Sequence, residues 1–167
     1  IEGRGRGPEY VYTITKAYRE AVDSYFDGTY NKTKVNGWMK QLETVYNRGF
    51  WNGGYYLGKK LGEWSGAYGS QATKEKFLIG NATNYFVKSN IAEFNLISGE
   101  LKVGDEIIIT GPTTGIMQFK VEKIMKDEKF INSAIKGDKI TIPVKERIRK
   151  NDRLFLLKDR DAKGNSV

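Results

Sequence analysis

The sequence contains neither cysteine nor histidine. These absences exclude disulfide bonds, thiolate nucleophiles, Ser-His and Cys-His catalysis, and zinc sites of the usual ligand types. Catalysis by carboxylates or lysine remains open, although the commonest general base is missing. No apolar run approaches the length of a membrane span and no signal-peptide pattern is present, so we expect no membrane partner. The lack of cysteine fits a reducing compartment, and we expect a cytoplasmic protein.

Charge is spread unevenly along the chain. The net charge is +8, and residues 116–167 carry 14 Lys or Arg against 8 acidic residues. A basic region of this kind is compatible with nucleic-acid binding. Lysine-rich strands and turns also keep a small β domain soluble and its edges unpaired. We favour the second interpretation on charge alone.

Residues 1–47 are predicted to form a helical segment. Pro8 and Glu9 suit a first helical turn, and apolar residues then recur at three- and four-residue steps as far as Asp27-Gly28. That stripe comprises Val11, Ile14, Tyr18, Ala21, Val22 and Tyr25. A second helix is predicted with Thr33 as its N-cap and an apolar stripe that begins at Val35. Two short helices cannot bury both stripes against each other alone.

Residues 48–73 form a predicted connector in which glycines alternate with aromatic residues, with no helical or strand period. Exposed aromatics beside basic side chains are what sequence-tolerant RNA or single-strand binding uses. We favour the alternative, in which the aromatics pack on a surface. The candidate binding residues here are Arg48, Phe50, Trp51, Lys59, Lys60 and Trp64.

Residues 74–160 change to a period of two, in short β-branched or aromatic runs that predict a small antiparallel β-barrel, followed by a tail at 161–167. The chain is therefore expected to be α+β and mainly β, with two helices before the barrel. The basic run that contains Lys145, Arg147, Arg149 and Lys150 could contact phosphates, although a solvated turn is the default.

One turn pattern occurs three times in this region. VGDEIIIT (103–110), KGDKITIP (136–143) and KNDRLFLL (150–157) each place Gly or Asn and then Asp before an alternating strand. Gly or Asn tolerates a positive φ, and an Asp side chain can accept a hydrogen bond from backbone N–H groups of the turn. We favour this structural role over a catalytic or metal-binding role for these acids.

Residues 77–158 resemble the second-domain β-barrel of translation elongation factors. The resemblance is carried by SGELKVGDEIIITGPTTGIMQFKVEKI, followed by INSAIKGDKITIPV and KNDRLFLL. It implies a barrel of the translation-factor domain-2 type. Barrels of this kind serve many functions, so the resemblance does not settle function.

A second and more specific resemblance is carried by three motifs in order, which are IEGR, PEYVYTITKAYREAVD and NRGF. Together they are similar to the collagenase-like peptidase family U32. IEGR is also the recognition sequence of the protease factor Xa, so it could be a remnant of cloning. The order of the three motifs favours the family interpretation. Gly5-Arg6-Gly7 departs from the commoner family segment, which leaves the local geometry there open. The matching positions are Ile1, Glu2, Gly3, Arg4, Pro8, Glu9, Tyr10, Val11, Tyr18, Arg19, Ala21, Asp23, Arg48, Gly49 and Phe50.

The family resemblance implies a longer parent whose N-terminal catalytic domain carries cysteines, and that domain would be a partner of this chain. Only Glu2 and Arg4 would lie at the edge of its site. No cofactor-binding or metal-binding residue is implied within this chain, and the cofactor of the parent stays unknown. Whether the parent is a working peptidase, and hence a hydrolase, is left open.

Two functions follow from the resemblance. The first is a non-catalytic C-terminal accessory domain that positions protein substrate or packs on the catalytic domain. The alternative is an RNA-binding module of a protein that hydroxylates tRNA or rRNA bases. An independent enzyme in this chain has little support, because no acid–base constellation is visible.

Overall fold

The computed structural model describes residues 1–50 and 69–160. These residues form two compact units. The β unit is Glu75–Asp159, and the helical unit comprises the described residues of Ile1–Lys74 together with Arg160. Most of the predicted connector and the whole predicted tail lie outside the described residues.

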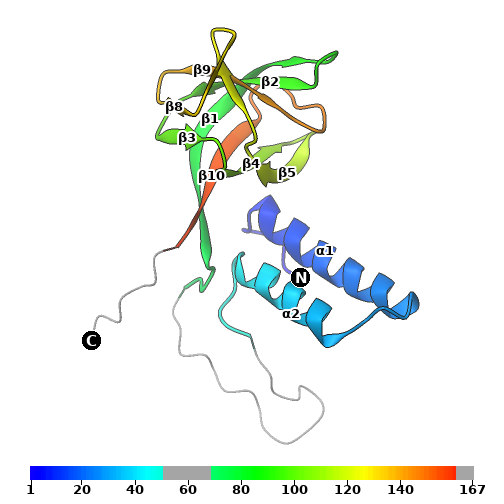
Figure 1. Cartoon of the computed structure of the whole chain (residues 1–167). Coiled ribbons are helices and arrows are strands. Elements are labelled where there is room, and N and C mark those ends of the chain that lie inside the picture. The colour runs from blue at the N-terminus through cyan, green and yellow to red at the C-terminus, as the bar shows by residue number, and fades with distance from the viewer. Residues whose placement is uncertain (51–68, 161–167) are drawn as a thin grey trace, which may run out of the picture. The chain divides into compact units, whose positions relative to one another are not determined.

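Helix α1 (Pro8–Phe26) begins and ends where the sequence predicts (Figure 1). Pro8 occupies the first turn with Glu9, where a missing N–H costs nothing and an acid meets the positive end of the helix dipole. Gly28 follows the C-cap Asp27 and stops the helix, because its φ of 68° lies in the left-handed region. Gly28 N–H donates to the Tyr25 carbonyl and Thr29 N–H to the Ser24 carbonyl, which is the Schellman pattern.

Helix α2 (Lys32–Glu43) starts earlier than the sequence predicts. Its N-cap is Asn31, and the prediction of Thr33 is wrong. Asn31 has extended backbone angles, and its side chain accepts a hydrogen bond of 3.0 Å from Lys34 N–H. An amide cap two residues upstream therefore satisfies the first turn before Thr33 is reached. The indole of Trp38 donates to Glu20 Oε2 of α1 at 2.9 Å and so joins the two helices.

The β unit is an antiparallel sheet of eight strands in the order β5-β4-β10-β1-β2-β9-β6-β7, with a separate pair β3-β8. The α+β, mainly β fold class is confirmed. No ladder joins the end strands β5 and β7 in the part of the chain that is described, so closure into a barrel stays a prediction. The strands are β1 (Lys74–Phe86), β2 (Ile91–Leu96), β3 (Glu100–Lys102), β4 (Glu106–Gly111), β5 (Gly115–Lys120), β6 (Ile124–Lys126), β7 (Lys129–Ile131), β8 (Ser133–Ile135), β9 (Lys139–Pro143) and β10 (Arg153–Asp159).

Strand boundaries differ from the alternating runs of the sequence in two places. The runs on either side of Asn81 form the single strand β1, which continues through an irregularity between Ala82 and Asn84 where its register with β2 shifts. The run GIMQFKVEKI instead breaks into β5 and β6, because Val121 turns back to hydrogen-bond with Gly104 and Asp105. Alternation alone does not reveal either event.

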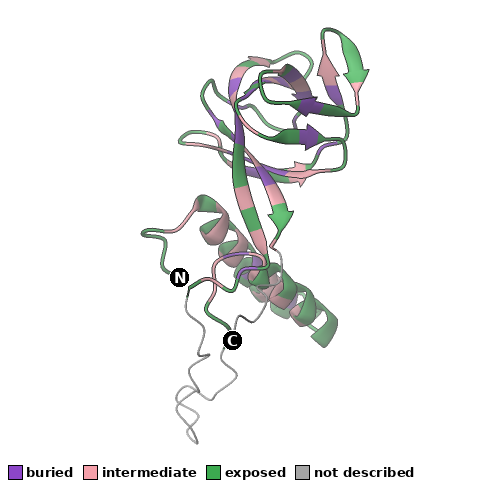
Figure 2. Cartoon of the chain, turned by 90° about the vertical axis from the view of Figure 1, so that its left-hand side faces the viewer, coloured by how far each residue is buried: buried purple, intermediate pink, exposed green. Residues whose placement is uncertain are grey.

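The core of the chain lies inside the β unit (Figure 2). Phe94, at the centre of β2, is fully buried and pairs with Ala82 of β1 and Ile140 of β9. The alternation of buried and exposed residues along β2 and β9 places one face of each strand in this core. Among the described residues of the helical unit, the buried hydrophobic ones are Ala17, Val45 and Ala72.

The three repeated Asp turns are confirmed, and their geometry is the same each time. Gly104, Gly137 and Asn151 have φ of 94°, 94° and 71°. Each following Asp accepts a hydrogen bond through Oδ2 from the backbone N–H three residues earlier, at 2.8, 2.9 and 2.7 Å. The carboxylates of Asp105, Asp138 and Asp152 thus fix the entry to β4, β9 and β10.

One of these turns should make the stability of the β unit depend on acid pH. Lys126 Nζ donates to Asp138 Oδ1 at 2.6 Å, and this bond, with the one from Ile135 N–H, lowers the pKa of Asp138. A lowered folded pKa contributes stability above the unfolded value of about 3.9 and loses it as pH falls through the folded pKa. We therefore expect Asp138→Asn to lower the thermal midpoint at pH 7 and to lower it much less at pH 3.

Asn at position 138 can still accept the bond from Ile135 N–H, so this variant isolates the contact with Lys126. The matched variant Lys126→Met should likewise have a lower unfolding midpoint than wild type at pH 7 and nearly the same midpoint in acid. The midpoints are measured across pH 2.5–7. A destabilisation that stays constant across this range would contradict the ion-pair explanation.

Candidate functional site

Glu2 and Arg4, the predicted edge of a neighbouring site, lie exposed before α1 and contact each other. Glu2 Oε1 accepts from the backbone N–H of Arg4 at 2.7 Å and lies 3.6 Å from Arg4 Nε. Both side chains are more than half exposed, so the contact is a local turn. Any role at the edge of a site stays a prediction for both residues.

Arg48 belongs to a small cluster around Tyr46. Arg48 Nε donates to Tyr46 Oη at 2.9 Å, and the Arg6 guanidinium lies 3.5 Å from the centre of the Tyr46 ring. The hydrogen bond from Arg48, with the nearby charge of Arg6, lowers the pKa of Tyr46. Phe50, another predicted binding residue, is 41% exposed in the same unit. Trp51, Lys59, Lys60 and Trp64 lie outside the described residues.

The basic run 145–150 is an exposed loop between β9 and β10. Val144 and Ile148 anchor it in the core, while the side chains of the four predicted residues Lys145, Arg147, Arg149 and Lys150 are exposed. Arg48 and Phe50 belong to the helical unit, whereas these four residues belong to the β unit. A binding role for either group stays a prediction.

The helical unit exposes part of the apolar stripe that sequence periodicity predicts for α1. Tyr18, Val22 and Tyr25 of α1 are 62%, 45% and 72% exposed. The opposite side of α1 carries the buried residues Ala17 and Ser24, and Glu20 on that side bonds to α2. Helix α1 therefore contacts α2 from the side of Glu20 and leaves Tyr18, Val22 and Tyr25 exposed.

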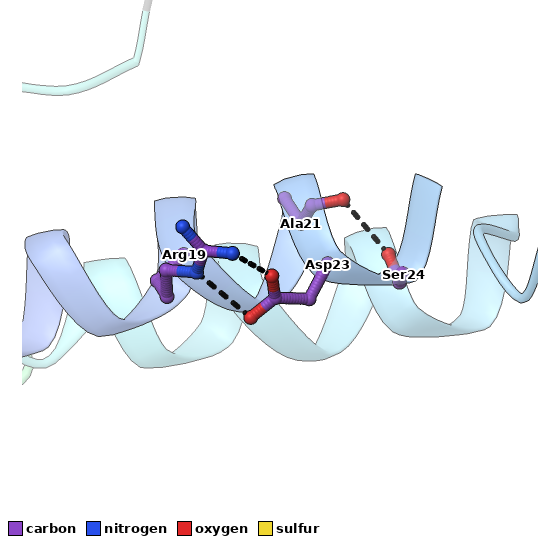
Figure 3. Close-up of polar contacts among 4 residues, drawn as sticks. All are labelled: Arg19, Ala21, Asp23 and Ser24. Atoms are coloured by element: carbon purple, nitrogen blue, oxygen red, sulfur yellow. Dashed lines mark hydrogen bonds and ion pairs between the residues drawn. The ribbon is translucent and has the colours of Figure 1, made fainter. Parts of the chain in front are cut away.

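Helix α1 also carries an ion pair (Figure 3). Arg19 donates to both carboxylate oxygens of Asp23, four residues along α1, with an Nε–Oδ2 distance of 2.9 Å. The bond from Arg19 lowers the pKa of Asp23, and the same contact raises that of Arg19. Ser24 Oγ donates to the Ala21 carbonyl and needs no partner outside the helix. Apolar side chains beside a charged pair are typical of the core and rim of a protein interface.

The β unit carries a groove that the sequence does not reveal. Its volume is about 330 Å³, and its walls are residues 119–123, at the end of β5 and before β6, and residues 142–145, at the end of β9. Phe119, Val121, Ile142 and Val144 supply apolar surface. Lys120, Lys123 and Lys145 supply positive charge, opposed by Glu122.

Two residues at this groove, Glu122 and Lys123, have no backbone hydrogen bond within the described chain. The ladder between β6 and β9 consists of the single pair Met125–Thr141, and the two segments separate on the side of the groove. Lys145 is the one predicted binding residue that lines the groove. The sequence does not predict the other residues that line the groove, because alternation of apolar residues does not reveal where two strands separate.

Residues 1–50 and 69–160 contain no group of three or more Asp or Glu placed to hold a metal ion. Asp105, Asp138 and Asp152 act separately in their turns.

Within the described residues, no helix is both long and apolar enough to cross a bilayer.

Comparison with known proteins connects the N-terminal residues with a family. Residues 1–66 match the family model described as peptidase family U32. The N-terminal part of the chain is therefore similar to peptidase family U32. The chain as a whole is 51% identical, over 161 residues or 96% of its length, to a collagenase of Porphyromonas gingivalis strain W83. It is 35% identical over 95% of its length to an uncharacterized protease of Methanocaldococcus jannaschii.

The similarity to these two relatives extends across most of the chain but covers less than half of each relative. The chain spans 39% of the length of each of these two proteins. Among solved structures, the C-terminal domain of a Geobacillus thermoleovorans protein assigned to the U32 peptidases matches 47% of this chain and 96% of that domain. Its identity is 19% and its TM-score 0.45.

Proposed function

We propose that this chain is a non-catalytic C-terminal accessory region of a longer collagenase-like U32 protein, and that its helical unit packs on the remainder of that protein. The stripe Tyr18-Val22-Tyr25 of α1 is the contact surface. The observation that carries the proposal is the exposure of these side chains in the part of the chain that matches the family model.

The physical argument rests on the cost of exposing apolar surface. Burial of apolar area contributes about 25 cal/mol per Å², so a helix that leaves two tyrosines and a valine in solvent forgoes several kcal/mol that a partner surface would restore. Isolated exposed apolar residues are ordinary, but three at steps of four and three on one helix face form a continuous patch. The relatives are more than twice as long as their matched region and supply an occupant of sufficient size.

The accessory role, rather than an enzymatic one, is supported by the chemistry present. The chain has no cysteine or histidine, and no three carboxylates of the described residues are grouped so as to hold a metal ion. No described observation favours the RNA-binding alternative. The basic residues proposed for it are divided between two units or lie outside the described residues.

The packing role predicts a specific loss of association in trans. The P. gingivalis collagenase, shortened by its matched 161 residues, should bind this chain in a pull-down or by calorimetry. The triple variant Tyr18→Ser, Val22→Ser, Tyr25→Ser should weaken that binding roughly a hundredfold or more, because buried aromatic side chains dominate interface energies.

A matched control changes exposed aromatics of the β unit instead, as Phe77→Ser, Phe86→Ser and Phe130→Ser, which are 46%, 43% and 68% exposed. This control should bind as wild type does, and circular dichroism should show α1 intact in both variants. Equal binding of the helix variant and wild type would refute the packing surface. Cleavage of gelatin or casein by the purified chain would refute the non-catalytic assignment.

A further inference from the structure

We propose that the groove between residues 119–123 and 142–145 of the β unit binds an extended, acidic peptide segment of another protein. This inference concerns a different surface from the α1 stripe, and it does not depend on how the helical unit packs.

The backbone at the groove provides the first argument. β6 and β9 are joined at one pair, Met125–Thr141, and then separate. Glu122 and Lys123 present N–H and C=O groups with no partner in the described chain. Such groups are a template for an added strand, whose own N–H and C=O groups would continue the ladder. A peptide in the groove would therefore be held in an extended conformation.

The side chains define what that peptide must carry. Buried or half-buried apolar residues form the floor, with Phe119 and Val121 on one side and Ile142 and Val144 on the other. In an extended peptide alternate side chains point to opposite faces, so apolar residues on one face would meet this floor. The volume of about 330 Å³ accommodates a short segment, because small-ligand sites start near this size.

Charge then selects acidic residues at the other positions. Lys120 and Lys123 stand on one wall and Lys145 on the opposite wall. No ion pair in the described ranges engages these three ammonium groups, although Lys123 lies 5.8 Å from the centre of the Phe130 ring. Three lysines against the single Glu122 leave the groove positive, and carboxylates on both sides of a bound strand would be complementary to it.

The same features argue against nucleic acid as the occupant. Single-stranded RNA binding relies on exposed aromatic faces for stacking and on a track of positive charge. Phe119, the one aromatic side chain in the lining, is partly buried, and Glu122 would oppose a phosphate. The lining contains no arginine, the residue best suited to phosphate and base recognition.

Binding of a defined peptide tests the proposal on the complete 167-residue chain. The probe is a fluorescein-labelled heptapeptide of alternating valine and glutamate, and its counterpart has lysine in place of glutamate. We expect fluorescence anisotropy to show saturable binding of the acidic peptide only. The variant Lys120→Gln, Lys123→Gln, Lys145→Gln should raise its dissociation constant at least tenfold.

The control variant removes the same charge elsewhere on the β unit. Lys88→Gln, Lys129→Gln and Lys136→Gln are exposed and do not line the groove, so this variant should bind as wild type. Amide hydrogen exchange at Glu122 and Lys123 should slow when peptide is present. Equal weakening in both triple variants would overturn the proposal, since it would indicate attraction to net charge alone. Failure of the acidic peptide to bind, or binding of a single-stranded RNA oligonucleotide in its place, would also overturn it.

Discussion

Gly111→Ala should lower the free energy of unfolding of the β unit by about 3 kcal/mol, because it combines overpacking with the loss of buried hydrogen bonds. A Cβ atom at position 111 would lie 1.8 Å from Asp152 Oδ1, so the carboxylate must move. Asp152 is only 2% exposed, and its Oδ2 accepts hydrogen bonds from Thr114 Oγ1 and Arg149 N–H. Displacing it would release both the 111–115 turn and the entry to β10.

A double-mutant cycle separates this contact from a general effect of the substitution. In an Asp152→Ala background the added methyl group no longer meets a carboxylate. Gly111→Ala should then be neutral, or stabilising by a few tenths of a kcal/mol through reduced freedom of the unfolded chain. Asp152→Asn should cost little, because its amide oxygen can accept both hydrogen bonds made to Oδ2. Equal costs of Gly111→Ala in both backgrounds would contradict the explanation.

Phe94→Ala should destabilise the β unit by about 3–5 kcal/mol, the range for removing a large aromatic side chain from a packed core. Phe94 is fully buried at the centre of the sheet and has core neighbours on both adjacent strands. Ala at this position would leave a cavity under three strands. Few single changes in this chain should have a larger effect.

The matched control for this prediction is Phe130→Ala, which removes the same atoms from a side chain that is 68% exposed. It should change stability by no more than about 0.5 kcal/mol, as for most surface substitutions. Tryptophans 38, 51 and 64 all precede Glu75, so their fluorescence does not report directly on this unit. Hydrogen exchange of the β1, β2 and β9 amides measures the free energy of unfolding of the β unit in each of these variants. A large loss of stability in Phe130→Ala would contradict the assignment of the core to the residues around Phe94.

The two proposed surfaces differ in the physics of recognition. The α1 stripe is aromatic and nearly uncharged, apart from the Arg19–Asp23 pair on the same helix, which suits a permanent contact within one protein. The groove of the β unit is positive and lined by open backbone groups, which suits reversible capture of a flexible segment. An accessory region that held both would keep a bound segment near the rest of its protein.

The sequence by itself determined the features that depend on neighbouring residues. Pro8 and Glu9 begin α1, and Gly28 ends it, because each acts within one helical turn. The three Asp turns are equally local, since each carboxylate bonds to the N–H three residues before it. Period-two alternation identified the strand-rich region for the same reason.

Only the tertiary structure decided which surfaces are open. Periodicity gives α1 an apolar stripe but cannot say which side meets α2, and the contact with α2 is made from the side of Glu20, where Ala17 and Ser24 are buried. The groove joins residues 119–123 to residues 142–145, which are about twenty positions apart and meet beside the pairing of β6 with β9. Such surfaces depend on long-range pairing, and the free energy of that pairing comes from burying Phe94 and its neighbours rather than from any local motif.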